Sequence, residues 1–192
     1  MKELKDRIVK EGRVLPGNII KVDGFLNHRV DMRLMRGMAK EFASYFAGRG
    51  ITAVMTVEAS GIALASVTAE ELGVPLLFAK KAKSDNIEGG LVSSEIYSYT
   101  YKKKVTLIIS AEWLSASDRV LVVDDFMANG EAIRGLIEIV EQVGAAVVGV
   151  GIAIEMGFQG GGDRLRSQGR DVKSLAIIEK AEPGCIEFRE DE

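Results

Sequence analysis

Residues 120–132 read VLVVDDFMANGEA, and this stretch decides the fold. Four consecutive apolar residues are followed by Asp124 and Asp125, then by Phe126 and Met127 and by the loop at 128–132, which leads into an apolar-periodic run at 133–143. A short, wholly apolar run before an amphipathic helix is typical of a buried strand in a parallel sheet. Ligands of open α/β sheets bind at the carboxyl ends of the strands, so we expect the two acids at a binding edge.

The rest of the chain repeats this alternation of apolar strand and amphipathic helix. It predicts an α/β fold with a central, mainly parallel sheet flanked by helices. Two further helices are expected, one ending near Gly12 and one capped by Asp31. Residues 84–109 break the alternation with Gly89, Gly90 and tyrosines at period two, which predicts an antiparallel hairpin. The strands are expected at 52–57, 75–79, 119–123 and 146–154, with helices at 61–71 and 133–143.

Composition limits the classes of protein that fit this chain. Its 192 residues are 47% hydrophobic, enough for one core, so we expect a single domain spanning residues 1–192. A net charge of −3 gives no reason to expect a nucleic acid or a membrane as partner. The charged amino terminus is not a secretory signal, and the single cysteine, Cys185, fits a reducing compartment. We therefore expect a cytoplasmic location.

The loop after the acid pair is suited to a phosphate group. Residues 128–132 open a helix, whose first N–H groups and positive dipole end attract anions. Gly130 lets the backbone approach such an anion closely. The carboxylates would repel phosphate but accept hydrogen bonds from sugar hydroxyls, so the segment predicts a phosphorylated ribose. Alternatively, one acid merely caps the helix and Gly130 only shapes a tight turn.

The stretch 120–132 resembles the phosphoribosyl-pyrophosphate motif of the class I phosphoribosyltransferases. This resemblance implies their fold, with a small hood at about 12–30 and the carboxyl-terminal segment, and a flexible β-hairpin flap at about 84–109. Asp124 and Asp125 would be catalytic and bind the ribose. The threonine usual in the loop is absent. The resemblance assigns the 5-phosphate to Ala128, Asn129, Gly130, Glu131 and Ala132.

Three further stretches are similar to the xanthine phosphoribosyltransferases of bacterial purine salvage. They read DGFLNH at 23–28, VEASGIA at 57–63 and IEMGFQ at 154–159. The similarity implies transfer of the phosphoribosyl group to xanthine, giving xanthosine 5′-monophosphate and pyrophosphate. Ile20, Asn27 and Met156 would line the base pocket, and Phe158 or Phe25 would stack on the purine or simply pack in the core.

The same resemblance places the pyrophosphate and its counter-ions. Glu58, Ala59, Ser60 and Gly61 open another helix after an apolar strand, where free N–H groups can hold pyrophosphate. Lys80, Lys81 and Lys83 would add cations at the same edge of the sheet. Mg²⁺ would be held mainly by the substrate diphosphate, with no direct protein ligand. The resemblance also implies a homodimer.

The acceptor base stays open at this point. The family usually carries lysine where this chain has Met156, and a thioether is only a weak acceptor. Hypoxanthine, guanine or adenine are therefore alternatives to xanthine. A non-catalytic regulator that senses phosphoribosyl pyrophosphate is a third hypothesis, although the sequence shows no DNA-binding segment before the first helix.

Overall fold

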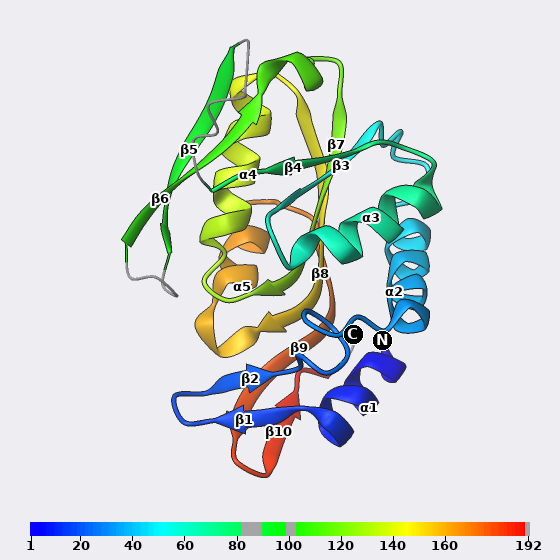
Figure 1. Cartoon of the computed structure of the whole chain (residues 1–192), viewed down its shortest axis with the longest axis vertical. Coiled ribbons are helices and arrows are strands. Elements are labelled where there is room, and N and C mark those ends of the chain that lie inside the picture. The colour runs from blue at the N-terminus through cyan, green and yellow to red at the C-terminus, as the bar shows by residue number, and fades with distance from the viewer. Residues whose placement is uncertain (82–89, 99–102, 191–192) are drawn as a thin grey trace.

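The computed structural model describes residues 1–81, 90–98 and 103–190, and its centre is a six-stranded sheet (Figure 1). The strands lie in the order β10-β9-β8-β7-β3-β4, and only the outer β10 runs antiparallel to its neighbour. The predicted mainly parallel sheet is therefore confirmed. The strands are β3 (Ala53–Val57), β4 (Leu76–Ala79), β7 (Arg119–Met127), β8 (Ala146–Met156), β9 (Val172–Glu182) and β10 (Cys185–Phe188).

Helices cover both faces of this sheet, as Figure 1 shows. One face carries α2 (Met32–Tyr45) and α3 (Gly61–Leu72), and the other carries α4 (Glu131–Gln142) and α5 (Gly161–Ser167). Leu121 and Val123 of β7 belong to the core on the first face, whereas Val120 and Val122 belong to the core on the second. A strand buried on both faces needs apolar side chains at every position, which explains the unbroken run at 120–123.

The predicted hairpin is present in the described part of residues 84–109. Strands β5 (Leu91–Ser98) and β6 (Lys103–Ser110) pair antiparallel along their whole length. Main-chain hydrogen bonds in both directions between Lys80 and Ile108 join β6 to the end of β4. Residues 82–89 and 99–102 lie outside the described residues, so the expectation for Lys83 has no structural counterpart here. A short 3-10 helix, η1 (Ala111–Trp113), follows β6.

A second small sheet lies in the segment expected to form the hood. Strands β1 (Arg13–Leu15) and β2 (Ile19–Lys21) pair antiparallel after helix α1 (Lys2–Glu11). Figure 1 shows this hairpin beside β9 and β10, so the amino-terminal and carboxyl-terminal segments meet at one end of the molecule. Asp31 accepts hydrogen bonds from the N–H groups of Arg33 and Leu34, which confirms it as the cap of α2.

The predicted strand boundaries were wrong at the binding edge. Strand β7 continues four residues beyond the expected end at 123, because Asp124 and Phe126 still pair with Ile152 and Ile154 of β8. The acid pair therefore lies within the strand rather than after it. Strand β8 likewise runs to Met156, and η2 (Gly157–Gln159) then leads toward α5.

The helices of the described chain are short. None of them combines the length and the apolar character needed to cross a lipid bilayer.

Candidate active site

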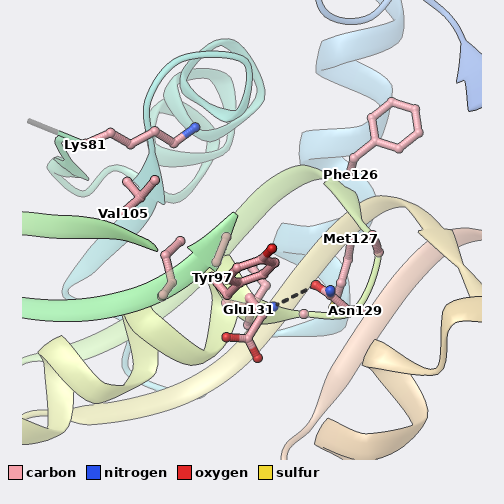
Figure 2. Close-up of a pocket in the computed structure, with 12 residues that line it drawn as sticks. Lys81, Tyr97, Val105, Phe126, Met127, Asn129 and Glu131 are labelled. Atoms are coloured by element: carbon pink, nitrogen blue, oxygen red, sulfur yellow. Dashed lines mark hydrogen bonds between the residues drawn. The ribbon is translucent and has the colours of Figure 1, made fainter. Parts of the chain in front are cut away.

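The loop between β7 and α4 forms one wall of a cavity of about 240 Å³ (Figure 2). Gly130 is the residue before the helix and has φ of +76°, a conformation that glycine adopts readily. It carries no capping side chain. The Asn129 Oδ1 accepts the Glu131 N–H at 3.4 Å. The structure thus brings all five predicted loop residues together around one cavity, whose other lining residues are Lys81, Ile96, Tyr97, Val105, Phe126, Met127 and Ile133.

Helix α5 supports this loop from behind, a contact that the sequence analysis missed. A Cβ atom on Gly161 would lie 2.6 Å from the Asn129 carbonyl carbon and 2.7 Å from the Gly130 nitrogen. The Arg164 guanidinium donates to the Asn129 carbonyl oxygen. The three glycines at 160–162 were a signal of such close packing, since glycine is favoured where two backbones meet.

The acid pair is almost completely buried. Asp124 is 6% exposed and Asp125 is 2% exposed. The Asp124 Oδ1 accepts the Asp125 N–H at 2.9 Å, and the Ser60 hydroxyl donates to Asp125 Oδ1 at 2.9 Å. Asp125 Oδ2 is buried without a hydrogen-bond partner among the described residues. Burial, and then repulsion from the neighbouring Asp125 carboxylate, raises the pKa of Asp124 well above its usual range.

A second strand–helix junction meets the acid pair, where β3 turns into α3. A Cβ atom on Gly61 would lie less than 3.0 Å from both Asp124 Oδ1 and Thr56 Oγ1, so this position requires glycine. Ser60 precedes the helix, but its hydroxyl bonds to Asp125 rather than to the helix. Ser60 and Gly61, expected at the pyrophosphate, therefore lie against the acids expected at the ribose.

Two of the three predicted lysines, Lys80 and Lys81, lie directly after β4, beside the same junction. Lys81 lines the loop cavity and also a neighbouring cavity of about 350 Å³, together with Glu58 and Ala59. Its N–H donates to Glu58 Oε1 at 2.7 Å. Figure 2 shows the Lys81 side chain across the cavity from Asn129. The flap residues Lys103 and Val105 complete the second cavity.

The residues expected at the purine come from β2, from the segment between β2 and α2, and from the end of β8 with η2. Ile20 of β2 and Met156 of β8 are both buried in the same hydrophobic core cluster. Asn27 is exposed, and Phe158 of η2 is 38% exposed. Phe25 is buried at 1% exposure, with the Arg7 guanidinium 5.2 Å from its ring centre. This placement agrees with the core-packing alternative for Phe25.

Comparison with known proteins identifies the family. Residues 22–192 match the sequence family of the phosphoribosyl transferase domain. The chain is 51% identical to the xanthine phosphoribosyltransferase of Bifidobacterium adolescentis, over 98% of this chain and 100% of that protein. It is 49% identical to the enzyme of the same name from Ruminiclostridium cellulolyticum, over 99% and 100% of the two chains.

Solved structures show the same fold at lower sequence identity. Adenine phosphoribosyltransferase from Giardia lamblia, complexed with 9-deazaadenine, superposes with a TM-score of 0.75 at 21% identity, over 91% of this chain and 96% of that one. The enzyme of the same name from Rhodothermus marinus gives 0.74 at 20% identity, over 92% and 99%. The chain therefore belongs to the phosphoribosyltransferase family, and within it to the xanthine phosphoribosyltransferases.

Proposed function

We propose that this protein transfers the 5-phosphoribosyl group from phosphoribosyl pyrophosphate to xanthine, forming xanthosine 5′-monophosphate and pyrophosphate in purine salvage. The observation that carries the proposal is identity of about half the residues, along nearly the whole chain, to proteins named for this reaction. The cavity at the loop after β7 supports it, because it has the donors that a sugar phosphate needs.

The donor substrate is bound by the two junctions of the sheet edge. The N–H groups of residues 128–132 take the 5-phosphate at the start of α4. Asp124 and Asp125 accept hydrogen bonds from the ribose hydroxyls. The buried Asp125 Oδ2, which has no partner among the described residues, is an acceptor that such a hydroxyl would satisfy.

Pyrophosphate leaves toward the second junction. The N–H groups of Ala59, Ser60 and Gly61 lie at the start of α3, where an anion is stabilised by the helix dipole. The Glu58 N–H already donates to the Ala79 carbonyl at 3.0 Å. Lys81, which lines both cavities, adds a positive charge there, and Lys80 and Lys83 stand beside it in sequence. The flap residues over these cavities would exclude water from the ribose carbon during transfer.

Bond breaking at the ribose carbon produces a transition state with oxocarbenium character, as in other glycosyl transfers. The carboxylates of Asp124 and Asp125 stabilise the positive charge that develops on the sugar. The purine nitrogen then forms the new bond to the carbon from which pyrophosphate departs. The residues of the chain thus bind and orient the two substrates and stabilise the charge that develops, without forming a covalent intermediate.

Magnesium fits this arrangement as a substrate-bound ion. Mg²⁺ is usually held by substrate phosphates and one or two carboxylates. Two buried carboxyl groups beside a phosphate-binding loop, one with a free oxygen, suit the ribose end of such a complex. When bound, Mg²⁺ would neutralise charge on the departing diphosphate.

The acceptor base lies against Ile20, Asn27 and Met156, with Phe158 at the rim. Met156 favours a second candidate, the same reaction with hypoxanthine, guanine or adenine, since its sulfur cannot donate to a purine oxygen. We also propose that the protein is a cytoplasmic homodimer. Sedimentation of the purified protein tests the dimer, and fractionation of the cells that produce it tests the location.

Pyrophosphate release tests the proposal directly. The protein is mixed with phosphoribosyl pyrophosphate, Mg²⁺ and one of the four purines, each in its own reaction. Release with xanthine above the other bases supports the assignment. Release with adenine alone would contradict the assignment of xanthine as the acceptor. No release with any base would contradict an enzymatic function and favour a regulator that senses phosphoribosyl pyrophosphate.

A further inference from the structure

A carboxylate stands at the start of the helix that is proposed to bind phosphate. Glu131 is the first residue of α4 and lines the loop cavity, with its side chain 26% exposed. A negative charge in this place would repel a phosphate group, and the repulsion is strong where water is partly excluded. The site therefore needs something that counters the charge of Glu131.

Arg134, one helical turn later, supplies the opposite charge. Its Nε and Nη2 lie 3.3 Å and 3.1 Å from the same oxygen of Glu131. Its Nη1 donates to Glu138, and its Nη2 also donates to the Glu95 carbonyl at 2.9 Å. Figure 2 shows the Glu131 carboxylate pointing away from the Asn129 side chain.

The contact with Glu95 connects the phosphate loop to the flap. Glu95 lies in β5, two residues before Tyr97, which lines the loop cavity. Ser94 of the same strand donates to Glu138 at 2.6 Å, so the helix and the strand share one network. A partly exposed pair at this spacing contributes little to stability by itself. Its position at the phosphate loop is therefore the more informative property.

We propose that Arg134 is a positioning residue for donor binding: it neutralises Glu131 and holds that carboxylate away from the 5-phosphate. This rests on the proposed assignment of the 5-phosphate to residues 128–132. The role of Arg134 is electrostatic and indirect, because its contacts are to Glu131, Glu138 and the flap strand. Arg134 sets the affinity for the donor without touching the purine.

A double-mutant cycle with the charge-neutralising variants Arg134→Gln, Glu131→Gln and the double variant tests the proposal. Arg134→Gln is expected to raise the KM for phosphoribosyl pyrophosphate roughly five- to tenfold, with the KM for xanthine unchanged. The ratio to wild type should shrink when the ionic strength is raised, because salt screens a partly exposed charge. Glu131→Gln keeps the backbone N–H that is proposed to bind the phosphate but removes the repelling carboxylate, so this variant alone should lower the donor KM below the wild-type value.

The double variant separates charge from structure. If Arg134 acts by neutralising Glu131, Glu131→Gln with Arg134→Gln restores the donor KM to near wild type, although the contact with Glu95 is still lost. Failure of this rescue would overturn the proposal and leave Arg134 as a structural link to β5. Arg170→Gln is the matched control, since Arg170 bonds to Glu141 at the far end of the same helix.

Binding of ribose 5-phosphate, measured by calorimetry, keeps the result independent of catalysis. The same pattern of weakening and rescue is expected for this ligand, which carries the 5-phosphate but no pyrophosphate. If wild type binds ribose 5-phosphate and neither single variant changes the affinity, the 5-phosphate does not lie at residues 128–132 and this proposal falls with that assignment. If the variants show this pattern relative to wild type but wild type releases no pyrophosphate with any base, the proposed reaction fails while the role of Arg134 stands.

Discussion

Asp124 is a carboxyl group that the fold keeps away from water and next to a second carboxyl group. An ionised carboxylate in such a place costs free energy unless a ligand compensates it. Asp124→Asn keeps the shape and removes the charge. We expect kcat/KM to fall at least about 100-fold, as for the loss of one strong electrostatic contact in a transition state.

The same substitution should make the free protein more stable at neutral pH. Because the folded-state pKa of Asp124 is raised, the folded protein holds this proton more tightly than the unfolded chain, and wild-type stability falls as pH rises above about 4. The Asp124→Asn protein does not lose this stability, because asparagine carries no titrating proton. Its melting temperature should exceed that of wild type by roughly 2–6 °C at pH 8 and by less at pH 5. A pH-independent difference in calorimetry would contradict this account.

Met156 is the residue whose substitution we expect to change the preferred purine most. It is 5% exposed at the end of β8, in one core cluster with Ile20. Met156→Lys adds a donor for a purine oxygen, and we expect the KM for xanthine to fall about tenfold or more. The buried ammonium should also lower the melting temperature. Met156→Leu is the matched control, and equal xanthine KM values in the two variants would remove residue 156 from the base pocket.

At the scale of elements, the contact between α4 and the flap hairpin depends on one glycine. A Cβ atom on Gly135 would lie 2.5 Å from Ile96 Cγ2 and 3.0 Å from Leu107 Cδ1. Alanine improves helix propensity by about 1 kcal/mol, but overpacking a core costs about 1–3 kcal/mol. The β-branched side chain of Ile96 cannot easily change its χ1 rotamer to make room. We therefore expect Gly135→Ala to lower the melting temperature by about 2–4 °C in calorimetry.

Gly37→Ala provides the comparison within another helix. Its Cβ would meet Met1 Cε at 3.0 Å, the flexible end of a side chain, so the melting temperature should stay equal or rise. If Gly135→Ala proves as stable as Gly37→Ala, the hairpin moves aside without cost. The packing of β5 and β6 on α4 would then not determine the position of the flap.

The sequence predicted four strands of the central sheet but not β9 or helix α5, and it ended β7 and β8 too early. An unbroken apolar run indicates a strand buried on both faces, and the runs at 120–123 and 146–154 both lie within strands. Apolar character did not predict where β7 ends, because main-chain pairing with β8 carries the strand on through Asp124 and Phe126. Main-chain hydrogen bonds form between N–H and C=O groups that every residue except proline carries, so the apolar or polar character of the side chains does not show where such pairing ends.

At the scale of the whole molecule, local motifs predicted the loop after β7 but not what surrounds it. The loop, with its glycine at positive φ, follows from a stretch of neighbouring residues. Its support by Gly161 and Arg164 joins positions more than thirty residues apart, as does the bond from Ser60 to Asp125. Only the topology of the sheet, which places β3 beside β7, brings such residues together.

Because the donor site joins distant elements, its ligand should stabilise the whole molecule. The proposed site takes groups from the junctions after β3 and β7, from the end of β4 and from the flap, whose cavities adjoin at Lys81. A ligand at one hundred times its Kd adds about 2.7 kcal/mol to the free energy of unfolding. Phosphoribosyl pyrophosphate with Mg²⁺ should thus raise the melting temperature by roughly 5–11 °C. Ribose 5-phosphate, at a matched concentration, should raise it less, since it leaves the junction at 58–61 empty. Equal shifts from the two ligands at this matched concentration would mean that the pyrophosphate group adds no binding energy and that residues 58–61 have another role.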